Sequence, residues 1–183
     1  IFPPGAFTFE ASIRPEPAEG AADLGGTRML FADVNATLVL SLRADGRVEA
    51  YRVKAGGTAR VVSPRPVLFR AWSRIAVTYD LAELTLYMDG VAVGSAPCEG
   101  ERASNVIGIG YNPFGAGSAY FLGCIDEARL DGVCRRPPAL TATPYGLVTG
   151  VKRSPPGNTL TWRWPWRERA GGSTVPTDGW WRG

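Results

Sequence analysis

The stretch "TLYMDGVAVGS" at residues 85–95 decides the fold, because it places an Asp89-Gly90 step between two alternating runs. A two-residue Asp-Gly connection accepts positive φ, and its twist matches that of the strands it joins. Before the turn, Leu86 and Met88 alternate with Tyr87, and such period-two alternation is typical of a strand that buries one face. The stretch therefore predicts an antiparallel β-hairpin lying on a hydrophobic core.

Similar runs recur along residues 1–138, separated by turn residues. They include "FTFEASIR" (7–14), "RMLFADV" (28–34), a second hairpin over 37–53 with its turn at Asp45-Gly46, "WSRIAVTYD" (72–80), "NVIGIGYN" (105–112) and "YFLGCIDEARLDG" (120–132). No convincing helix interrupts them, and many short strands with turns between them indicate an all-β sandwich of two antiparallel sheets. The alternation predicts a core that includes Phe7, Phe9, Ile13, Leu30, Leu38, Leu40, Ile75, Val77, Leu84, Leu86, Ile107 and Ile125.

Composition excludes several function classes. The 183 residues contain no histidine, which removes histidine-based nucleophile systems and histidine metal ligands. The net charge of +3 is too small to indicate nucleic acid, and no apolar run is long enough for a transmembrane segment. The chain begins with Ile1 and shows no signal-peptide pattern, so either a leader has been removed or the sequence is a fragment. In a secreted protein two of the three cysteines would pair, and we favour Cys98 with Cys134 over pairings that use Cys124.

The order of the segments resembles the laminin G-like, or concanavalin A-like, jelly-roll superfamily over about residues 6–135. The strongest matches are residues 72–80 followed by the Asp89-Gly90 hairpin, and Phe121-Leu122-Gly123 followed by residues 125–130. The resemblance implies a two-sheet jelly roll, usually secreted or on a cell surface, that binds carbohydrate, mediates adhesion or serves as an appended module. Relatives usually carry another strand before the first one matched here, where this chain has only residues 1–6.

Acidic residues provide no catalytic pair. Glycosidases of the same superfamily would need carboxylates spaced as Glu-x-Asp-x-x-Glu on one strand face, and the sequence has no such run. Asp126 and Glu127 are adjacent, so they point to opposite faces of a strand. We therefore expect no enzyme activity. Many family members bind calcium, for which Asp126, with Asn112 and Asp80 in nearby loops, is the candidate set; the favoured alternative is that Asp126 binds the backbone of a neighbouring loop.

Two segments carry candidate ligand-binding residues. The loop "NPFGAGSAY" (112–120) offers Phe114 and Tyr120, which either stack on a sugar ring or pack beneath their own loop. In the tail, "NTLTWRWPWRER" (158–169) puts a very large apolar face on one parity and Arg163 on the other. That apolar face consists of Leu160, Trp162, Trp164 and Trp166. From residue 139 onward the charge is +4, from six basic and two acidic residues.

Four roles are open for this tail. It completes the sandwich of its own chain, inserts into a neighbouring subunit, binds carbohydrate through stacked tryptophans, or contacts an anionic polymer or membrane surface. The first two explain why so much apolar surface is tolerated. Linkage between subunits is favoured of these, because Pro155-Pro156-Gly157 suits an extended connector.

The sequence as a whole predicts a laminin G-like domain over residues 1–138 and an extended Trp- and Arg-rich tail over 139–183. The expected function is non-enzymatic, in adhesion or structural self-assembly of a secreted or cell-surface protein. The tail would join copies into a homo-oligomer or polymer. The alternative is a carbohydrate-binding module, and a glycan-cleaving enzyme is a distant third. No cofactor other than calcium is suggested.

Overall fold

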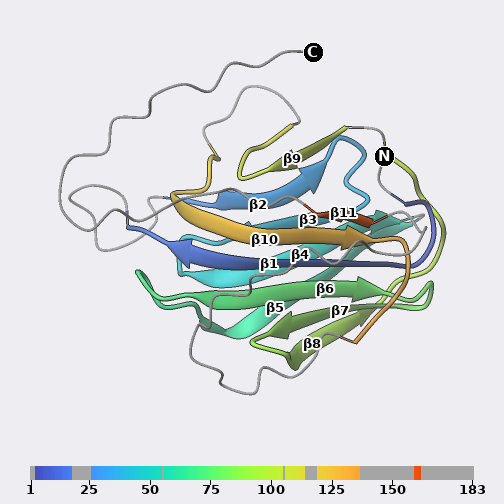
Figure 1. Ribbon diagram of the computed structural model, residues 1–183. Helices are drawn as coiled ribbons and strands as arrows, with labels where there is room; N and C mark the ends of the chain where they lie inside the picture. Colours follow the sequence, from blue (N-terminus) through green and yellow to red (C-terminus); the bar gives the residue numbers. More distant parts are fainter. Residues whose placement is uncertain are drawn as a thin grey trace, which may run out of the picture.

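The computed structural model describes residues 3–17, 26–54, 56–104, 106–113 and 119–136, together with the backbone of 159–161. These residues form eleven strands and no helix. One sheet has the order β11-β10-β1-β6-β7-β8 and the other has the order β5-β4-β3-β2-β9, and every neighbouring pair is antiparallel. Figure 1 shows the two sheets as the layers of a sandwich. The all-β jelly-roll prediction is confirmed.

The strands follow the alternating runs of the sequence. Those of the six-stranded sheet are β1 (Phe7–Pro15), β6 (Ser73–Tyr79), β7 (Glu83–Met88), β8 (Val91–Pro97), β10 (Gly123–Asp131) and β11 (Thr159–Thr161). Those of the five-stranded sheet are β2 (Arg28–Asp33), β3 (Val39–Leu42), β4 (Arg47–Lys54), β5 (Gly57–Pro66) and β9 (Ile107–Ile109).

The predicted hairpin is β7 and β8. Asp89 and Gly90 have φ values of 52° and 80°, so both central residues lie in the left-handed region, as a two-residue hairpin turn of this twist requires. The second predicted hairpin joins β3 to β4 by a longer connection. In that connection Gly46 has φ 76° and its amide donates to the carbonyl oxygen of Arg43 over 2.9 Å.

The core lies between the sheets and confirms most of the predicted residues. Fully buried are Phe7, Phe9, Ile13, Leu30, Leu38, Leu40, Ile75, Val77, Leu84 and Leu86. Across the sheets, the ring centroids of Phe9 and Phe31 are 4.4 Å apart. Ile107 and Ile125 are only partly buried and pack against the edge of this core. Each large side chain removed from water contributes roughly 2 kcal/mol, so this layer dominates the stability.

The three thiols are free in the structure. Cys98 is buried and Cys124 and Cys134 are exposed, so the preferred disulfide between Cys98 and Cys134 is wrong for this structure. The thiol of Cys134 interacts instead with the side chain of Thr78 on β6.

Candidate functional site

Phe114, Trp162, Arg163, Trp164 and Trp166 lie outside the described residues. Tyr120 is described, and its side chain is 60% exposed in the loop that leads to β10. Its backbone neighbour Ala119 accepts a hydrogen bond from the amide of Met29 on β2, which ties this loop to the five-stranded sheet.

The two carboxylates proposed for calcium lie far apart. Asp126 on β10 is level with Ser12 and Arg74, whereas Asp80 follows the last residue of β6. Six residues of extended chain between Arg74 and Asp80 correspond to about 20 Å. The two side chains therefore do not share one cation. Among the described residues no group of three or more acidic, Cys or His side chains gathers as a metal site.

Both carboxylates are also engaged locally. Asp80 Oδ1 accepts hydrogen bonds from the amides of Ala82 (3.0 Å) and Glu83 (2.8 Å) at the start of β7, and these bonds hold the pKa of Asp80 below its usual value. Asp126 Oδ1 accepts from the amide of Glu127 over 2.8 Å. Both carboxylates therefore stabilise the backbone of their own segments.

An open hollow lies on the outer face of the β7–β8 hairpin. This hairpin groove is a shallow depression of about 510 Å³, lined by Glu83, Thr85, Tyr87, Ala92, Gly94, Ser95 and Arg136. Most of the lining residues belong to residues 85–95, the stretch that forms the hairpin. It combines one aromatic ring with hydroxyl, carboxylate and guanidinium groups.

Tyr87 is the only aromatic side chain among the described residues that line the hairpin groove, and its cross-strand neighbours are small. Ala76 on β6 and Ala92 on β8 stand directly opposite it on the two flanking strands. Cross-strand partners on one face have Cβ atoms about 5 Å apart, so a large residue at either position would cover the ring. The register of β7 with β8 shifts beside Tyr87, where Leu86 pairs with Gly94 and Tyr87 with Ala92, so the extra residue of this bulge is Val93 on β8.

The chain after β10 forms one end of the hairpin groove. The hydroxyl of Thr8 donates to the carbonyl of Val133 over 2.8 Å and accepts from the amide of Arg135 over 2.7 Å. Thr8 belongs to the outer face of β1, so residues 132–136 cross that face over β1 and β6 and reach β7 at Arg136. Figure 1 shows this segment leaving β10 and turning towards β8.

An ion-pair ladder occupies the same outer face and runs from β6 across β1 to β10. Arg74 Nη2 lies 2.7 Å from Glu10 Oε2, and Arg129 Nη2 lies 2.9 Å from Asp131 Oδ2. Arg129 also approaches Glu10 at 4.0 Å, which connects the two pairs. The outer face therefore has two parts. One part carries the ion-pair ladder, and the other is the hairpin groove, with an aromatic ring and polar groups.

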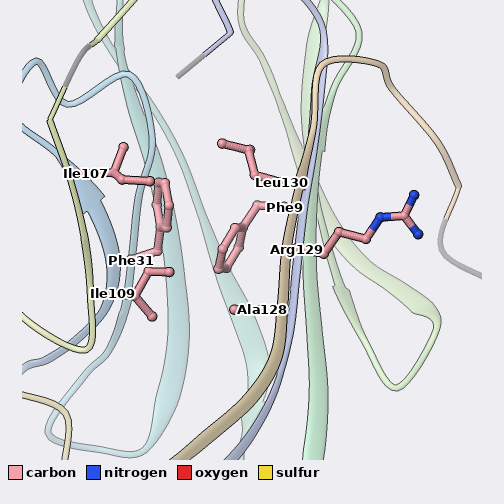
Figure 2. Close-up of a pocket in the computed structure, with 7 residues that line it drawn as sticks. All are labelled: Phe9, Phe31, Ile107, Ile109, Ala128, Arg129 and Leu130. Carbon is pink, nitrogen blue, oxygen red and sulfur yellow. The ribbon is translucent and has the colours of Figure 1, made fainter. Parts of the chain in front are cut away.

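A second hollow opens between the sheets and is apolar. This edge crevice is lined by Phe9, Phe31, Ile107, Ile109, Ala128, Leu130 and the stem of Arg129. Figure 2 shows the apolar side chains directed into the space between β9 and β10, whereas the guanidinium of Arg129 points away from it. The described residues of the edge crevice direct no polar group into it that could orient a ligand, so we do not choose it as the candidate site for a small polar molecule.

Sequence reasoning placed Tyr87 on the outward face of its strand but did not identify it as a site residue. The signal that could have found it is the outward run Thr85 and Tyr87 beside the small residues of β8, with alanine at position 92. The strand pattern could not have identified Arg136 as a residue of the groove. Arg136 reaches the groove because residues 132–136 cross over β1 and β6, which lie far from them in the sequence.

The chain belongs to the concanavalin A-like lectin/glucanases superfamily, whose family model matches residues 1–138. A comparison with curated protein sequences finds no match to this chain. In the described part of the chain, no helix is long and apolar enough to cross a membrane.

Three solved structures illustrate the likeness. A Bacteroides ovatus protein to which carbohydrate binding has been ascribed is 19% identical, with a TM-score of 0.59 over 72% of this chain and 38% of that protein. The CBM40 of Ruminococcus gnavus IT-sialidase, bound to α2,3-sialyllactose, is 16% identical, with a TM-score of 0.53 over 66% of this chain and 72% of that one. Domain 4 of the extracellular GH43 arabinanase AbnA from Geobacillus stearothermophilus, in complex with arabinotriose, is 17% identical, with a TM-score of 0.53 over 71% of this chain and 62% of that one. At these identities the likeness shows the fold.

Proposed function

We propose that this chain is a carbohydrate-binding module whose ligand lies in the hairpin groove. The observation that carries the proposal is Tyr87, flanked on both sides by alanine in a groove that is also lined by Glu83, Thr85 and Arg136. A sugar ring has apolar C–H faces that stack on an aromatic ring and equatorial hydroxyls that need donors and acceptors at the rim. The hairpin groove offers both within one shallow, open surface.

The structural neighbours support this choice of ligand class. Two of them are described with an oligosaccharide bound, sialyllactose in one and arabinotriose in the other. The fold is shared, but the identity is below one residue in five, so the position of the sugar and its identity do not transfer. A shallow open groove suits an oligosaccharide chain or a chain end better than a fully enclosed monosaccharide.

We also propose that the module binds and does not cleave. The sequence has no histidine, and the carboxylate of Asp126 accepts a hydrogen bond from the amide of the adjacent Glu127. Among the described residues that line the hairpin groove, Glu83 supplies one carboxylate, whereas glycoside hydrolysis uses a pair. Binding by stacking and hydrogen bonds needs no metal, so the proposal does not require calcium.

Adhesion or self-assembly through the tail is the second candidate, with a secreted or cell-surface location. The specific observation in favour of a tail contact is that β11 pairs with β10. The strand pairs within one chain, however, so this contact favours completion of the chain's own sheet over linkage between copies. An extracellular location agrees with the AbnA neighbour, which belongs to an extracellular enzyme.

The test is a glycan-array screen of the full chain, followed by calorimetry with the best ligand. Tyr87→Ala should weaken binding at least about tenfold, which corresponds to about 1.4 kcal/mol of lost contact. Tyr120→Ala is the matched control, because it removes an exposed tyrosine from the loop before β10. If Tyr120→Ala abolishes binding and Tyr87→Ala does not, the ligand lies on that loop and the hairpin groove is not the site.

A further inference from the structure

Among the described residues, the edge of the sandwich between β9 and β10 is incompletely covered. Ile107 and Ile109 on β9, which line the edge crevice, are only partly buried, and so is Ile125 on β10. β9 has three residues and is the shortest strand of its sheet among the described residues. An apolar edge of this kind normally pairs with a further strand.

The backbone of β10 is also only partly paired on this side. β10 runs from Gly123 to Asp131, but β11 pairs with its last three residues, from Arg129 to Asp131. Residues 123–128 therefore have no strand partner on that side among the described residues. Of the three β10 residues that line the edge crevice, Arg129 and Leu130 are paired with β11, and Ala128 is the first residue of the unpaired part.

The register of β11 gives the direction in which the chain continues. Thr159 is opposite Asp131 and Thr161 is opposite Arg129, so the chain runs towards the unpaired half of β10. In a regular antiparallel continuation, position 162 is the next register position and lies opposite Ala128. Directly opposite residues share a face, and Figure 2 shows Ala128 and Leu130 on the crevice side.

The other neighbour of β10 shows how a strand continues past this point. β1 pairs with β10 across a bulge, with Phe9 opposite Leu130 and Ile13 opposite Ile125. The core-facing residues of this part of β1 are Phe9, Ala11 and Ile13, which are spaced at every second position. A strand on the other side of β10 with the same spacing would place positions 160, 162 and 164 towards the crevice.

We propose that residues 162–164 extend β11 along β10 of the same chain, so that Trp162 and Trp164 cover the edge crevice. Each tryptophan brings about 200 Å² of largely apolar surface to an edge whose wall is isoleucine and phenylalanine. Arg163 occupies the intervening position and points to the outer face. Pro165 has no amide to donate, so it ends the strand at this edge without leaving a ladder bond unmade.

The chain's own tail is the occupant because its first three strand residues are already in register. Extending an existing strand needs no new chain crossing and adds little loop-closure entropy. A second copy would have to displace β11 from the same edge before its own tail could bind. The proposal is therefore independent of the hairpin groove, which lies on the outer face of β7 and β8.

A register-specific cross-link tests the proposal in the full chain. Cys124 and Cys134 are replaced by serine, which leaves the buried Cys98, and Ala128→Cys is combined with Trp162→Cys. The matched control combines Ala128→Cys with Arg163→Cys, which shifts the register by one position and turns the side chain to the other face. After mild oxidation, most of the first variant should be linked within one chain, at least about tenfold more than the control.

Each other result overturns the proposal. Equal linking in both variants would mean an unstructured tail, and no linking in either would mean that the tail lies elsewhere. A covalent dimer, seen on a non-reducing gel and by mass spectrometry of mixed isotope-labelled chains, would show that a second copy supplies the strand. A second measurement requires no cysteine: Trp164→Ser should lower the unfolding midpoint by about 2–4 °C, whereas Arg163→Ser should leave it unchanged.

Discussion

Arg52 and Tyr79 share one acceptor inside the protein. Arg52 Nη2 and the Tyr79 hydroxyl each donate to the carbonyl oxygen of Gly100 over 2.7 Å, and the guanidinium carbon lies 4.1 Å from the centre of the Tyr79 ring. Arg52 is 1% exposed and comes from β4, whereas Tyr79 comes from the opposite sheet. The pair therefore joins both sheets to the connection that follows β8.

The first prediction concerns this buried guanidinium. Arg52→Ala should destabilise the protein by about 3 kcal/mol or more, because it removes a hydrogen bond and leaves a cavity beside two aromatic rings. Arg52→Met should cost less, about 1–2 kcal/mol, since it fills most of the volume and avoids the desolvation of a charge, which already lowers the pKa of Arg52. Urea unfolding measures both, and an alanine variant as stable as the methionine variant would contradict this account.

The second prediction concerns the thiols. Two cysteines should react with a thiol reagent in the native protein and the third, Cys98, only after unfolding, because it is fully buried while Cys124 and Cys134 are exposed. Burial also raises the pKa of Cys98 above its ordinary value of 9.0. Three reactive thiols in the native state, or only one because two are bridged, would contradict the prediction.

The raised pKa of Cys98 gives a pH dependence with a definite sign. The folded state holds the thiol proton more tightly than the unfolded state, so this stabilisation is complete below about pH 9 and declines as the pH rises above that value. Burial likewise raises the pKa of Tyr79 above 10.0, which continues the decline at higher pH. Cys98→Ala should flatten the loss of stability between about pH 9 and 10, as measured by urea unfolding at successive pH values.

The strands were predictable because alternation is a local property of the chain. Phe7, Phe9 and Ile13 fall on one parity of "FTFEASIR", and the structure buries all three. Ile107 and Ile125 alternate as well but lie at an open edge, and no local pattern reports which strand is at the edge. The sequence also does not show at which level of the sheet a residue lies. Asp80 and Asp126 were therefore grouped as calcium ligands, and only the pairing register shows that they lie far apart.

The candidate site was less predictable than the fold. Its floor, Tyr87 and Thr85, is the outward parity of a predicted hairpin, but outward residues are numerous in any sandwich. What distinguishes this part of the surface is the crossing of residues 132–136, fixed by hydrogen bonds between Thr8 and positions 125 and 127 residues away. Contacts of that sequence separation are set by the packed fold and leave no periodic signal in the sequence.

Gly123 provides a prediction about the start of β10. It has φ 134°, and a Cβ atom there would overlap the carbonyl oxygen of Arg14 and lie 2.9 Å from Cα of Pro15. Gly123→Ala should therefore destabilise the protein by about 2 kcal/mol more than Gly56→Ala, because Gly56 also has positive φ but a Cβ atom there would meet no other atom within 4 Å. Thermal unfolding compares the two, and equal losses would mean that the close approach of β1 to Gly123 is relieved by a small shift.

The last prediction separates the ion-pair ladder from the hairpin groove on the same outer face. Glu10 accepts from Arg74 over 2.7 Å and its side chain is 11% exposed, so Glu10→Gln should cost about 2 kcal/mol of stability. Glu10 is level with Tyr87 but two strands away, about 10 Å, so the same substitution should leave glycan affinity within about twofold. Tyr87→Ala should do the reverse, weakening binding with little loss of stability. Urea unfolding and calorimetry on both variants measure the four quantities. A folded Glu10→Gln protein that no longer binds would mean that the ligand extends across β6 onto the ladder, and that Arg74 contacts it.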